Sequence, residues 1–241
     1  LGSEGDDLIN GGDGNDLALM GAGDDTFVWN PGDDNDTLEG QAGFDTMLFN
    51  GANVSENITI SANGGRALFF RDVASVVMDL NDVEKIQFHA LGGADTIVVN
   101  DLSGTDVTEL FINLAAANGA GDGAADTVIL NATSADDVVL VVGDSGAVQV
   151  LGLDYVINIV GFESALDRLV INTLGGDDVI EASGVLAGAI QLVLNGGDDN
   201  DVLIGGDGND VLSGGAGDDV LIGGLGIDVL DGGSGDNVVI Q

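Results

Sequence analysis

Cysteine is absent from this sequence of 241 residues, histidine occurs once, and lysine and arginine together occur four times. Zinc and other transition metals prefer cysteine and histidine ligands, so the composition argues against them. Nucleic acids and anionic membrane surfaces are bound through basic side chains, of which the sequence has almost none. Catalysis on an acidic polysaccharide would need a base and clustered cations, which are equally scarce. We therefore expect neither an enzyme nor a nucleic-acid-binding protein.

Proline and long apolar runs are also scarce. The single proline, beside 41 glycines, excludes a collagen-like repeat. No uncharged apolar run is as long as the roughly 18 residues needed to cross a membrane, so we expect no membrane insertion. The first four residues do not form a signal peptide, and we expect the chain to be a fragment of a longer protein.

Aspartate is present in excess. There are 42 acidic residues, most of them aspartate rather than glutamate, and the formal net charge is −38. Aspartate favours turns and metal sites, whereas a highly charged helical protein would favour glutamate. Yet 44% of the residues are hydrophobic, so the chain is not a disordered acidic tail. Because such a charge opposes the compact state, we expect cations to be part of the folded structure.

Glycine and aspartate recur with a nine-residue period at both ends of the chain. From Gly196 to Ile240, five consecutive nonapeptides follow one pattern: GGDDNDVLI, GGDGNDVLS, GGAGDDVLI, GGLGIDVLD and GGSGDNVVI. A looser set begins at Gly2 with GSEGDDLIN, GGDGNDLAL and MGAGDDTFV and, after Trp29 and Asn30, continues with PGDDNDTLE and GQAGFDTML. Such a period indicates a solenoid in which each coil buries its apolar side against its neighbours.

The region between the two repeat blocks contains a longer duplication. Residues 45–50 recur at 126–131, an offset of 81, and residues 91–95 recur at 174–178. Short β-prone runs, punctuated by Gly, Asn and Asp, follow one another about every ten residues without a convincing helix. We therefore expect an all-β protein in three parts, with a tandem repeat of about 80 residues in the second: an N-terminal nonapeptide block at 1–48, a β-helical centre at 49–195 and a C-terminal nonapeptide block at 196–241.

Each nonapeptide GGxGxDxUx combines a turn with a short strand. The first six residues turn the chain, and the central apolar residue of the last three faces inward. In the C-terminal block these inward residues are Leu203, Leu212, Leu221, Leu230 and Val239. Two nonapeptides make one coil, so we expect Asp201 over Asp219 and Asp210 over Asp228, roughly 4.8 Å apart.

Carboxylates stacked at this spacing repel each other unless a hard cation lies between them. Ca²⁺ accepts about six to eight oxygen ligands, backbone carbonyls included, so that turns of successive coils can share one ion. Mg²⁺ demands a tighter octahedron and retains its waters. We therefore expect several Ca²⁺ ions, and we expect Ca²⁺ to order the chain better than Mg²⁺.

The nonapeptides resemble the repeat-in-toxin (RTX), or hemolysin-type, calcium-binding repeats of secreted bacterial proteins. The resemblance implies a right-handed parallel β-roll or β-helix solenoid with Ca²⁺ between stacked turns. It implies that the ligands are the aspartate at position six, backbone carbonyls near the glycines and some acidic residues at position five. Matched residue by residue, the candidate ligands are Asp7, Asp16, Asp25, Asp36, Asp45, Asp201, Asp210, Asp219 and Asp228 at position six, Asp24 and Asp218 at position five, and the turn glycines Gly11, Gly12, Gly14, Gly196, Gly197, Gly205, Gly206, Gly208, Gly214, Gly215, Gly217, Gly223 and Gly224.

Some turns depart from the pattern. The last repeat has Asn237 at position six, so its site should be weaker or act as a terminal cap. Asp95 and Asp178 follow Leu-Gly-Gly turns outside the nonapeptides, and they either bind a metal or shape a turn.

For function, the resemblance implies a calcium-binding structural module of a secreted or cell-surface bacterial protein. Such a module would leave the cell by type I secretion and fold on Ca²⁺ outside it. Two alternatives remain open: an adhesin or matrix module that binds extracellular glycans or surfaces and, less favoured, a non-catalytic part of a polysaccharide-active enzyme.

Overall fold

The computed structural model describes the whole chain, residues 1–241. Apart from the short 3-10 turn η1 (Val73–Ser75), its regular elements are all β-strands, which confirms the predicted all-β class. The chain divides into two compact units, which we call the N-terminal unit (Leu1–Ala124) and the C-terminal unit (Ala125–Gln241).

The N-terminal unit contains strands of two sheets. One has the order β1-β3-β5-β9-β11 and the other the order β2-β4-β8-β7-β6-β10. The strands are β1 (Leu8–Ile9), β2 (Leu17–Ala22), β3 (Thr26–Trp29), β4 (Asp36–Ala42), β5 (Thr46–Asn50), β6 (Asn57–Asn63), β7 (Arg66–Arg71), β8 (Val76–Asn81), β9 (Lys85–Leu91), β10 (Thr96–Val99) and β11 (Glu109–Ala116). Consecutive strands of the first coils thus alternate between the two sheets, as in a roll.

The C-terminal unit has the same alternation. Its sheets have the orders β15-β14-β13-β17-β19-β21-β23 and β12-β16-β18-β20-β22. The strands are β12 (Thr127–Asn131), β13 (Val138–Gly143), β14 (Ala147–Leu151), β15 (Val156–Val160), β16 (Arg168–Asn172), β17 (Val179–Val185), β18 (Gln191–Asp198), β19 (Val202–Ile204), β20 (Val211–Ala216), β21 (Val220–Ile222), β22 (Val229–Ser234) and β23 (Val238–Ile240).

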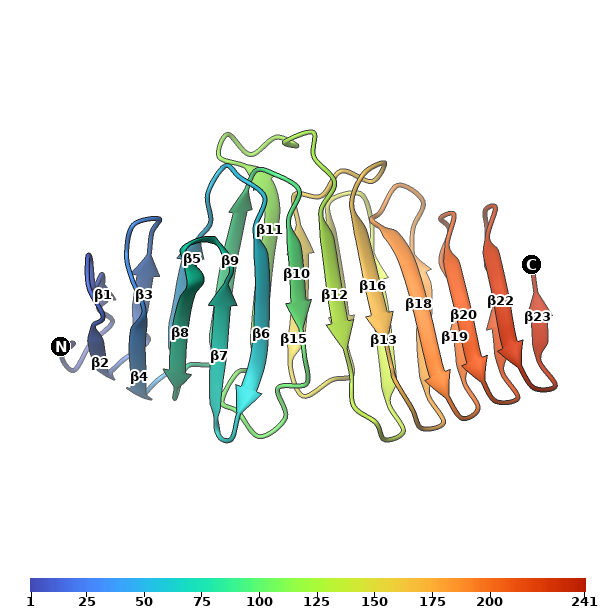
Figure 1. Ribbon diagram of the computed structural model, residues 1–241, viewed down its shortest axis with the longest axis horizontal. Coiled ribbons are helices and arrows are strands. Elements are labelled where there is room, and N and C mark those ends of the chain that lie inside the picture. Colours follow the sequence, from blue (N-terminus) through green and yellow to red (C-terminus); the bar gives the residue numbers. More distant parts are fainter. The chain divides into compact units, whose positions relative to one another are not determined.

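Strand pairing in the C-terminal repeat block advances by two nonapeptides per coil. Val202 of β19 pairs with Val220 of β21, which pairs in turn with Val238 of β23. In the other sheet β18, β20 and β22 pair in the same direction and lie side by side (Figure 1). These parallel pairs confirm the predicted β-roll. In the N-terminal block the step from Thr26 to Thr46 is longer, because Trp29 and Asn30 are inserted into that coil.

Each unit also contains a three-stranded antiparallel meander, which the repeat pattern did not predict. In the N-terminal unit β6, β7 and β8 pair antiparallel, and in the C-terminal unit β13, β14 and β15 do so. The meanders begin at Asn57 and Val138, which are separated by the same offset as the two copies of the duplication. A Gly64-Gly65 turn joins β6 to β7, and such short glycine turns favour hairpins over crossovers.

Aromatic side chains fill the core of the N-terminal unit. Trp29 and Phe49 stack with ring centroids 4.0 Å apart and planes inclined by 4°. Phe69 and Phe88 pack beside Phe49 in tilted arrangements, and all four rings are fully buried. Each such ring pair contributes about 0.5–1.5 kcal/mol beyond its buried area.

Aliphatic side chains fill the core of the C-terminal unit. Leu203, Leu212 and Leu221 are fully buried, as expected for the inward residue of a nonapeptide. Leu230 is only partly buried and Val239 is 49% exposed. The prediction that all five residues of this row face a core is therefore wrong for the final coil, since an inward side chain is covered only where a further coil packs on it.

Candidate metal-binding turns

In both units acidic residues directly precede strands, so they lie along the side of the sheet at which its strands begin. Because the strands are parallel, the equivalent residues of successive coils lie next to one another. In most of these pairs the backbone N–H of one residue donates a hydrogen bond to a carboxylate oxygen of its neighbour one coil further on. We call such a row a carboxylate ladder.

The longest ladder of the C-terminal unit contains Asp137, Asp178, Asp201, Asp219 and Asn237. The N–H of Asp178 donates to Oδ1 of Asp201 at 3.0 Å, and the N–H of Asp201 donates to Oδ1 of Asp219 at 3.0 Å. The links from Asp137 to Asp178 and from Asp219 to Asn237 are both 2.7 Å. The structure thus places Asp201 beside Asp219, and it continues their row outside the nonapeptides through Asp178.

Two shorter ladders lie at the edge of the other sheet of this unit. The N–H of Asp210 donates to Oδ1 of Asp228 at 3.0 Å, so this predicted pair is also adjacent. The N–H of Asp126 donates to Oδ1 of Asp167 at 2.8 Å. Neither Asp126 nor Asp167 belongs to a nonapeptide, and both directly precede a strand.

The N-terminal unit contains a ladder of Asp7, Asp25, Asp45 and Glu84. The N–H of Asp7 donates to Oδ1 of Asp25 at 2.7 Å, and the N–H of Asp25 donates to Oδ1 of Asp45 at 2.9 Å. The N–H of Asp45 then donates to Oε2 of Glu84 at 2.7 Å. Glu84 therefore takes the place of a position-six aspartate although it lies outside the repeats.

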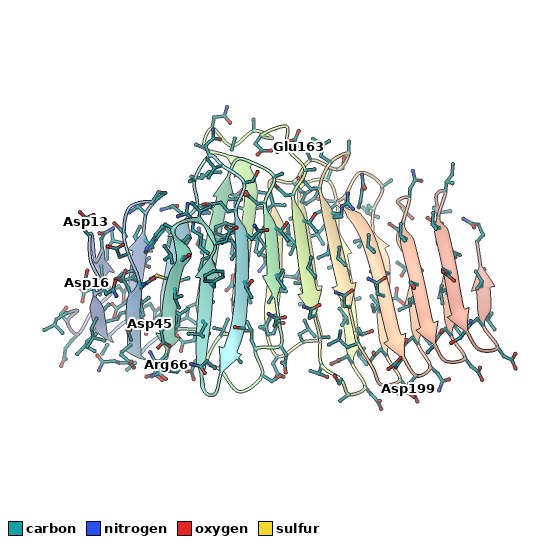
Figure 2. All side chains as sticks on the ribbon, in the orientation of Figure 1. Asp13, Asp16, Asp45, Arg66, Glu163 and Asp199 are labelled. Atoms are coloured by element: carbon teal, nitrogen blue, oxygen red, sulfur yellow. The ribbon has the colours of Figure 1, made fainter.

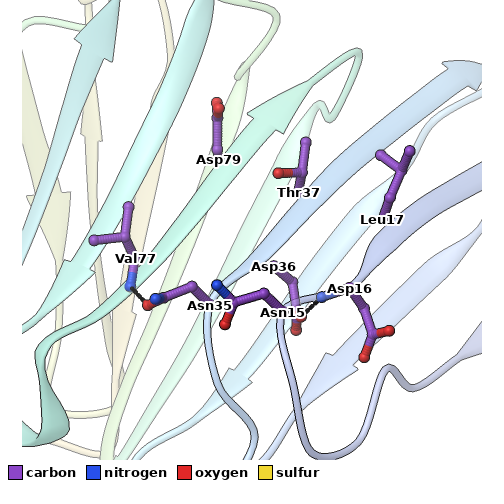
Figure 3. Close-up of a pocket in the computed structure, with 8 residues that line it drawn as sticks. All are labelled: Asn15, Asp16, Leu17, Asn35, Asp36, Thr37, Val77 and Asp79. Carbon is purple, nitrogen blue, oxygen red and sulfur yellow. Dashed lines mark hydrogen bonds between the residues drawn. The ribbon is translucent and has the colours of Figure 1, made fainter.

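At the other edge of the N-terminal unit, Asp16 and Asp36 form a pair. The N–H of Asp16 donates to Oδ1 of Asp36 at 2.8 Å, while Oδ1 of Asn35 accepts the N–H of Val77 at 2.7 Å (Figure 3). These residues line a shallow groove of about 400 Å³. Asp36 is buried and Asp16 is exposed, so the two predicted ligands differ in environment.

The second carboxylate oxygen distinguishes the ladder residues. Seven aspartates are buried and have an Oδ2 atom without any hydrogen-bond partner: Asp25, Asp36, Asp45, Asp178, Asp201, Asp219 and Asp228. A buried carboxylate oxygen left unsatisfied is costly, so each calls for a cation or a proton. Six of the seven are position-six residues predicted as ligands, and the seventh is Asp178.

Other turns satisfy the same oxygen from their own backbone. The N–H and hydroxyl of Ser3 donate to Oδ2 of Asp7 at 2.5 and 2.9 Å. The N–H of Gly206 donates to Oδ2 of Asp210 at 2.8 Å. Two predicted ligands, Asp7 and Asp210, are therefore capped by the residue four positions earlier.

Backbone conformation separates the two kinds of turn. In the seven turns with an unpartnered oxygen, the residue four positions before the aspartate has a positive φ: Gly21, Gly32, Gln41, Leu174, Gly197, Gly215 and Gly224. Ser3 and Gly206 have no positive φ, and their N–H groups point at the carboxylate. For Gln41 and Leu174 this conformation is strained, because a Cβ disfavours it.

The first glycine of the nonapeptide leaves space against the carboxylate. A Cβ on Gly214 would collide with Oδ2 of Asp219 and approach the carbonyl oxygen of Gly232 in the next coil. A Cβ on Gly196 would do the same to Oδ2 of Asp201 and the carbonyl of Gly214. Gly205 and Gly223 also stand at position one of their nonapeptides. A Cβ on either would likewise collide with a carboxylate, that of Asp210 or Asp228 respectively. Carboxylate and carbonyl oxygens thus face these glycines, which is the donor set of a hard cation.

The position-five residues form an outer, exposed row. The N–H of Asp24 donates to Oδ1 of Asp6 at 2.9 Å, and Oδ1 of Asp24 accepts the N–H of Phe44 at 2.9 Å. Oδ1 of Asp218 similarly accepts the N–H of Asp236 at 2.8 Å. Two further exposed aspartates of the turns are labelled in Figure 2, Asp13 and Asp199. These exposed carboxylates add negative charge around the ladders.

Burial and mutual repulsion destabilise the ionised ladder. Burial raises the pKa of Asp36 and of Asp201 to about 6, with further upward shifts from neighbouring aspartates. Burial also raises the pKa of Asp45, Asp178 and Asp210. A carboxyl whose charged form is this disfavoured gains the most from a neighbouring cation.

The residues present fit Ca²⁺. No group of three or more His, Cys, Asp or Glu side chains converges on one point, so carboxylates alone do not form a site. Each pair of neighbouring turns in a ladder instead offers carboxylates of successive coils together with backbone carbonyls. Ca²⁺ readily accepts this mixture of oxygen ligands in flexible geometry. The fold and its ladders define a class: parallel β-rolls with oxygen-lined turns.

Comparison with known proteins finds one family of repeats at both ends of the chain. Residues 1–27, 31–48, 195–230 and 213–240 match the RTX calcium-binding nonapeptide repeat. Both ends of the chain thus contain RTX repeats, as its nonapeptides predicted. No curated protein matches the chain. The structure contains no helix that is long and apolar enough to span a membrane.

Proposed function

We propose that this chain is a structural module of a secreted or cell-surface protein, and that it folds when Ca²⁺ fills its ladders. RTX nonapeptides indicate a calcium-binding repeat module. The observation that carries the proposal is the set of buried aspartate oxygens without partners, several of them facing a glycine. Folding without cations would leave each of these charges buried and unpaired, which is strongly unfavourable.

The coupling of binding to folding supports a location outside the cell. The ladders exist only when the coils are stacked, so the free energy of Ca²⁺ binding contributes directly to folding. Extracellular modules bind Ca²⁺ at about 10⁻⁴–10⁻³ M, and sites of that class would be empty at low cytosolic Ca²⁺. The chain would then remain unfolded in the cytosol, leave by type I secretion and fold outside the cell.

The single tryptophan and the single tyrosine of the chain cannot stack on a sugar ring at the surface. Trp29 is fully buried and Tyr155 is 3% exposed, so both belong to the cores. We therefore put forward the structural role and advance no glycan-binding function.

A calcium titration of the whole chain tests the proposal. Calorimetry should show several bound ions, and circular dichroism should show β-structure forming over the same range. Mg²⁺ at equal concentration should order the chain far less, because it retains its waters and demands a tight octahedron. Full β-structure in EGTA, or equal ordering by both ions, would overturn the proposal.

A glycine pair provides the matched control. Gly214→Ala places a Cβ against Asp219 and the carbonyl of Gly232, so it should weaken Ca²⁺ binding and lower the midpoint of unfolding in Ca²⁺. Gly175→Ala should change neither by much, since the nearest atom to its Cβ would be Cβ of Asp198 at 3.7 Å and its φ is not positive. Equal effects of the two substitutions would argue against a cation beside Gly214.

A further inference from the structure

The ladder of Asp7, Asp25 and Asp45 does not stop where the N-terminal nonapeptides end. The next strand in that sheet is β9, which pairs in parallel with β5 and follows Glu84 directly. The N–H of Asp45 donates to Oε2 of Glu84 at 2.7 Å, and the N–H groups of Glu84 and Lys85 donate to the carbonyl oxygen of Asp45 at 3.1 and 3.0 Å. The Glu84 turn is therefore stacked on the Asp45 turn.

An unpartnered oxygen points into this junction. Asp45 is fully buried and its Oδ2 has no hydrogen-bond partner. A Cβ on Gly40 would lie 2.6 Å from this Oδ2 and would collide with the carbonyl oxygen of Asp82. The carboxylate of Asp45 and the carbonyl of Asp82 thus converge on the same glycine, as Asp219 and Gly232 converge on Gly214.

The backbone has a positive φ on both sides of the junction. Gln41 has a φ of 78° and Asp82 a φ of 50°, although neither is glycine. A Cβ disfavours this region, and residues other than glycine that are held in it are concentrated at functional sites. The N–H of Asp82 donates to Oδ2 of Asp106 at 3.1 Å, a contact that helps to hold this turn.

We infer that Asp45, the carbonyl of Asp82 and the carboxylate of Glu84 bind a Ca²⁺ ion at the boundary between the N-terminal repeats and the centre. Two of these three ligands lie outside the segments that match the RTX repeat. The inference rests on the proposed function and adds ligands to it. Its consequence is that the ladder of nonapeptide turns is tied to β9, beyond the end of the repeats.

The Asp178 turn shows a contrasting arrangement at the corresponding boundary of the C-terminal repeats. There position one is Thr173, a fully buried residue whose hydroxyl donates to the carbonyl oxygen of Gly196 at 2.9 Å. The side chain of Thr173 thus donates a hydrogen bond to the carbonyl of the next coil. Gly40 has no side chain that could do the same for the carbonyl of Asp82. We include no ion beside Asp178 in the proposal.

The test substitutes Glu84 in the full chain. Glu84→Gln keeps an acceptor for the N–H of Asp45 but removes the negative charge, so the folded protein should bind one Ca²⁺ fewer, counted by equilibrium dialysis. Hydrogen exchange should show reduced Ca²⁺-dependent protection at residues 40–50 and 82–85, with residues 196–240 unchanged. Glu84→Asp, which keeps the charge, should retain the ion with weaker affinity.

The controls separate this inference from the proposed function. Asp101→Asn removes one exposed charge from the same unit, at a residue whose carboxylate accepts bonds from nearby Ser103, and should leave the ion count unchanged. If Glu84→Gln binds as many ions as the wild type with the same protection, the Glu84 site does not exist, even though residues 196–240 still respond to Ca²⁺. If residues 196–240 of the wild type do not respond to Ca²⁺ either, the proposed function itself fails.

Discussion

The two units have the same formal charge, but they differ in the number of basic side chains that can neutralise their carboxylates. The N-terminal unit has 22 acidic and 3 basic residues, and the C-terminal unit has 20 and 1, so each carries −19. All three basic residues of the N-terminal unit, Arg66, Arg71 and Lys85, form ion pairs. Arg168 of the C-terminal unit is exposed. The C-terminal unit must therefore take nearly all its neutralising charge from solution.

Arg71 illustrates how a side chain can replace an ion. Its guanidinium bonds to Glu56, a fully buried ladder residue whose N–H donates to Oδ1 of Asp95 at 2.8 Å. The guanidinium also lies 5.4 Å from the centre of the Trp29 ring, which favours a cation. Glu56 thus has a permanent counter-charge, whereas Asp201 and Asp219 have unpartnered oxygens. One ladder geometry therefore accepts an internal cation at Glu56, and under the proposed function it accepts Ca²⁺ from solution at Asp201 and Asp219.

The largest expected effect is a difference between the units on removal of Ca²⁺. In EGTA the C-terminal unit should lose its protection from hydrogen exchange almost completely, because it has a single basic residue and an aliphatic core. The N-terminal unit should retain partial protection around β6–β9, which contain its three basic residues as well as Phe69 and Phe88 of the aromatic core. Peptide-resolved exchange measures this directly. Equal loss of protection in both units would mean that Arg66, Arg71 and Lys85 do not stabilise the N-terminal unit in the absence of Ca²⁺.

A smaller effect is expected from removing the internal cation. Arg71→Met should leave Glu56 buried and unpaired, which costs about 3–5 kcal/mol and should make the N-terminal unit as dependent on Ca²⁺ as the C-terminal unit. Arg66→Met provides the control, since Arg66 pairs with Glu39 and Asp79 near the surface with 27% of its side chain exposed. That pair should contribute no more than about 1 kcal/mol. Urea unfolding measures the loss of unfolding free energy in each variant. Equal losses would contradict the conclusion that the buried pair of Arg71 and Glu56 stabilises the unit more than the surface pairs of Arg66 do.

The smallest effect is expected from acid. Without Ca²⁺, burial raises the pKa of Asp36 and Asp201 to about 6, above the ordinary value of 3.8, so the folded chain takes up protons. Stability of the Ca²⁺-free protein should then rise as the pH falls from about 7 to about 5, because the folded state binds more protons there than the unfolded state. In saturating Ca²⁺ the same acidification should lower stability, since protons displace the ion. The β-structure content at both pH values in EGTA, by circular dichroism, and the urea midpoints at both pH values in Ca²⁺ measure the two slopes; slopes of the same sign would contradict this account.

The nonapeptides alone predicted much of the fold and of the candidate ladders. The strict nine-residue period with inward leucines predicted coils of two nonapeptides, and the adjacency of Asp201 and Asp219 follows from that coil length. The motif also predicted the residue types around each site, because turn glycines and aspartates are the local requirement of the roll. The duplication predicted two related segments at a fixed offset, but it did not indicate that each would contain an antiparallel meander.

Only the tertiary structure decided which carboxylates are satisfied and by what. Gly206 and Gly215 hold the same position in one motif, yet only Gly215 has a positive φ, so Asp210 is capped by its own turn and Asp219 is not. The parts played by Glu84 and Arg71 were equally hidden, because they depend on the pairing of β5 with β9 and on the meander. Local sequence determines turns and periods, which depend on neighbouring residues. Charge compensation depends on which coils stack, and stacking joins residues far apart in the chain.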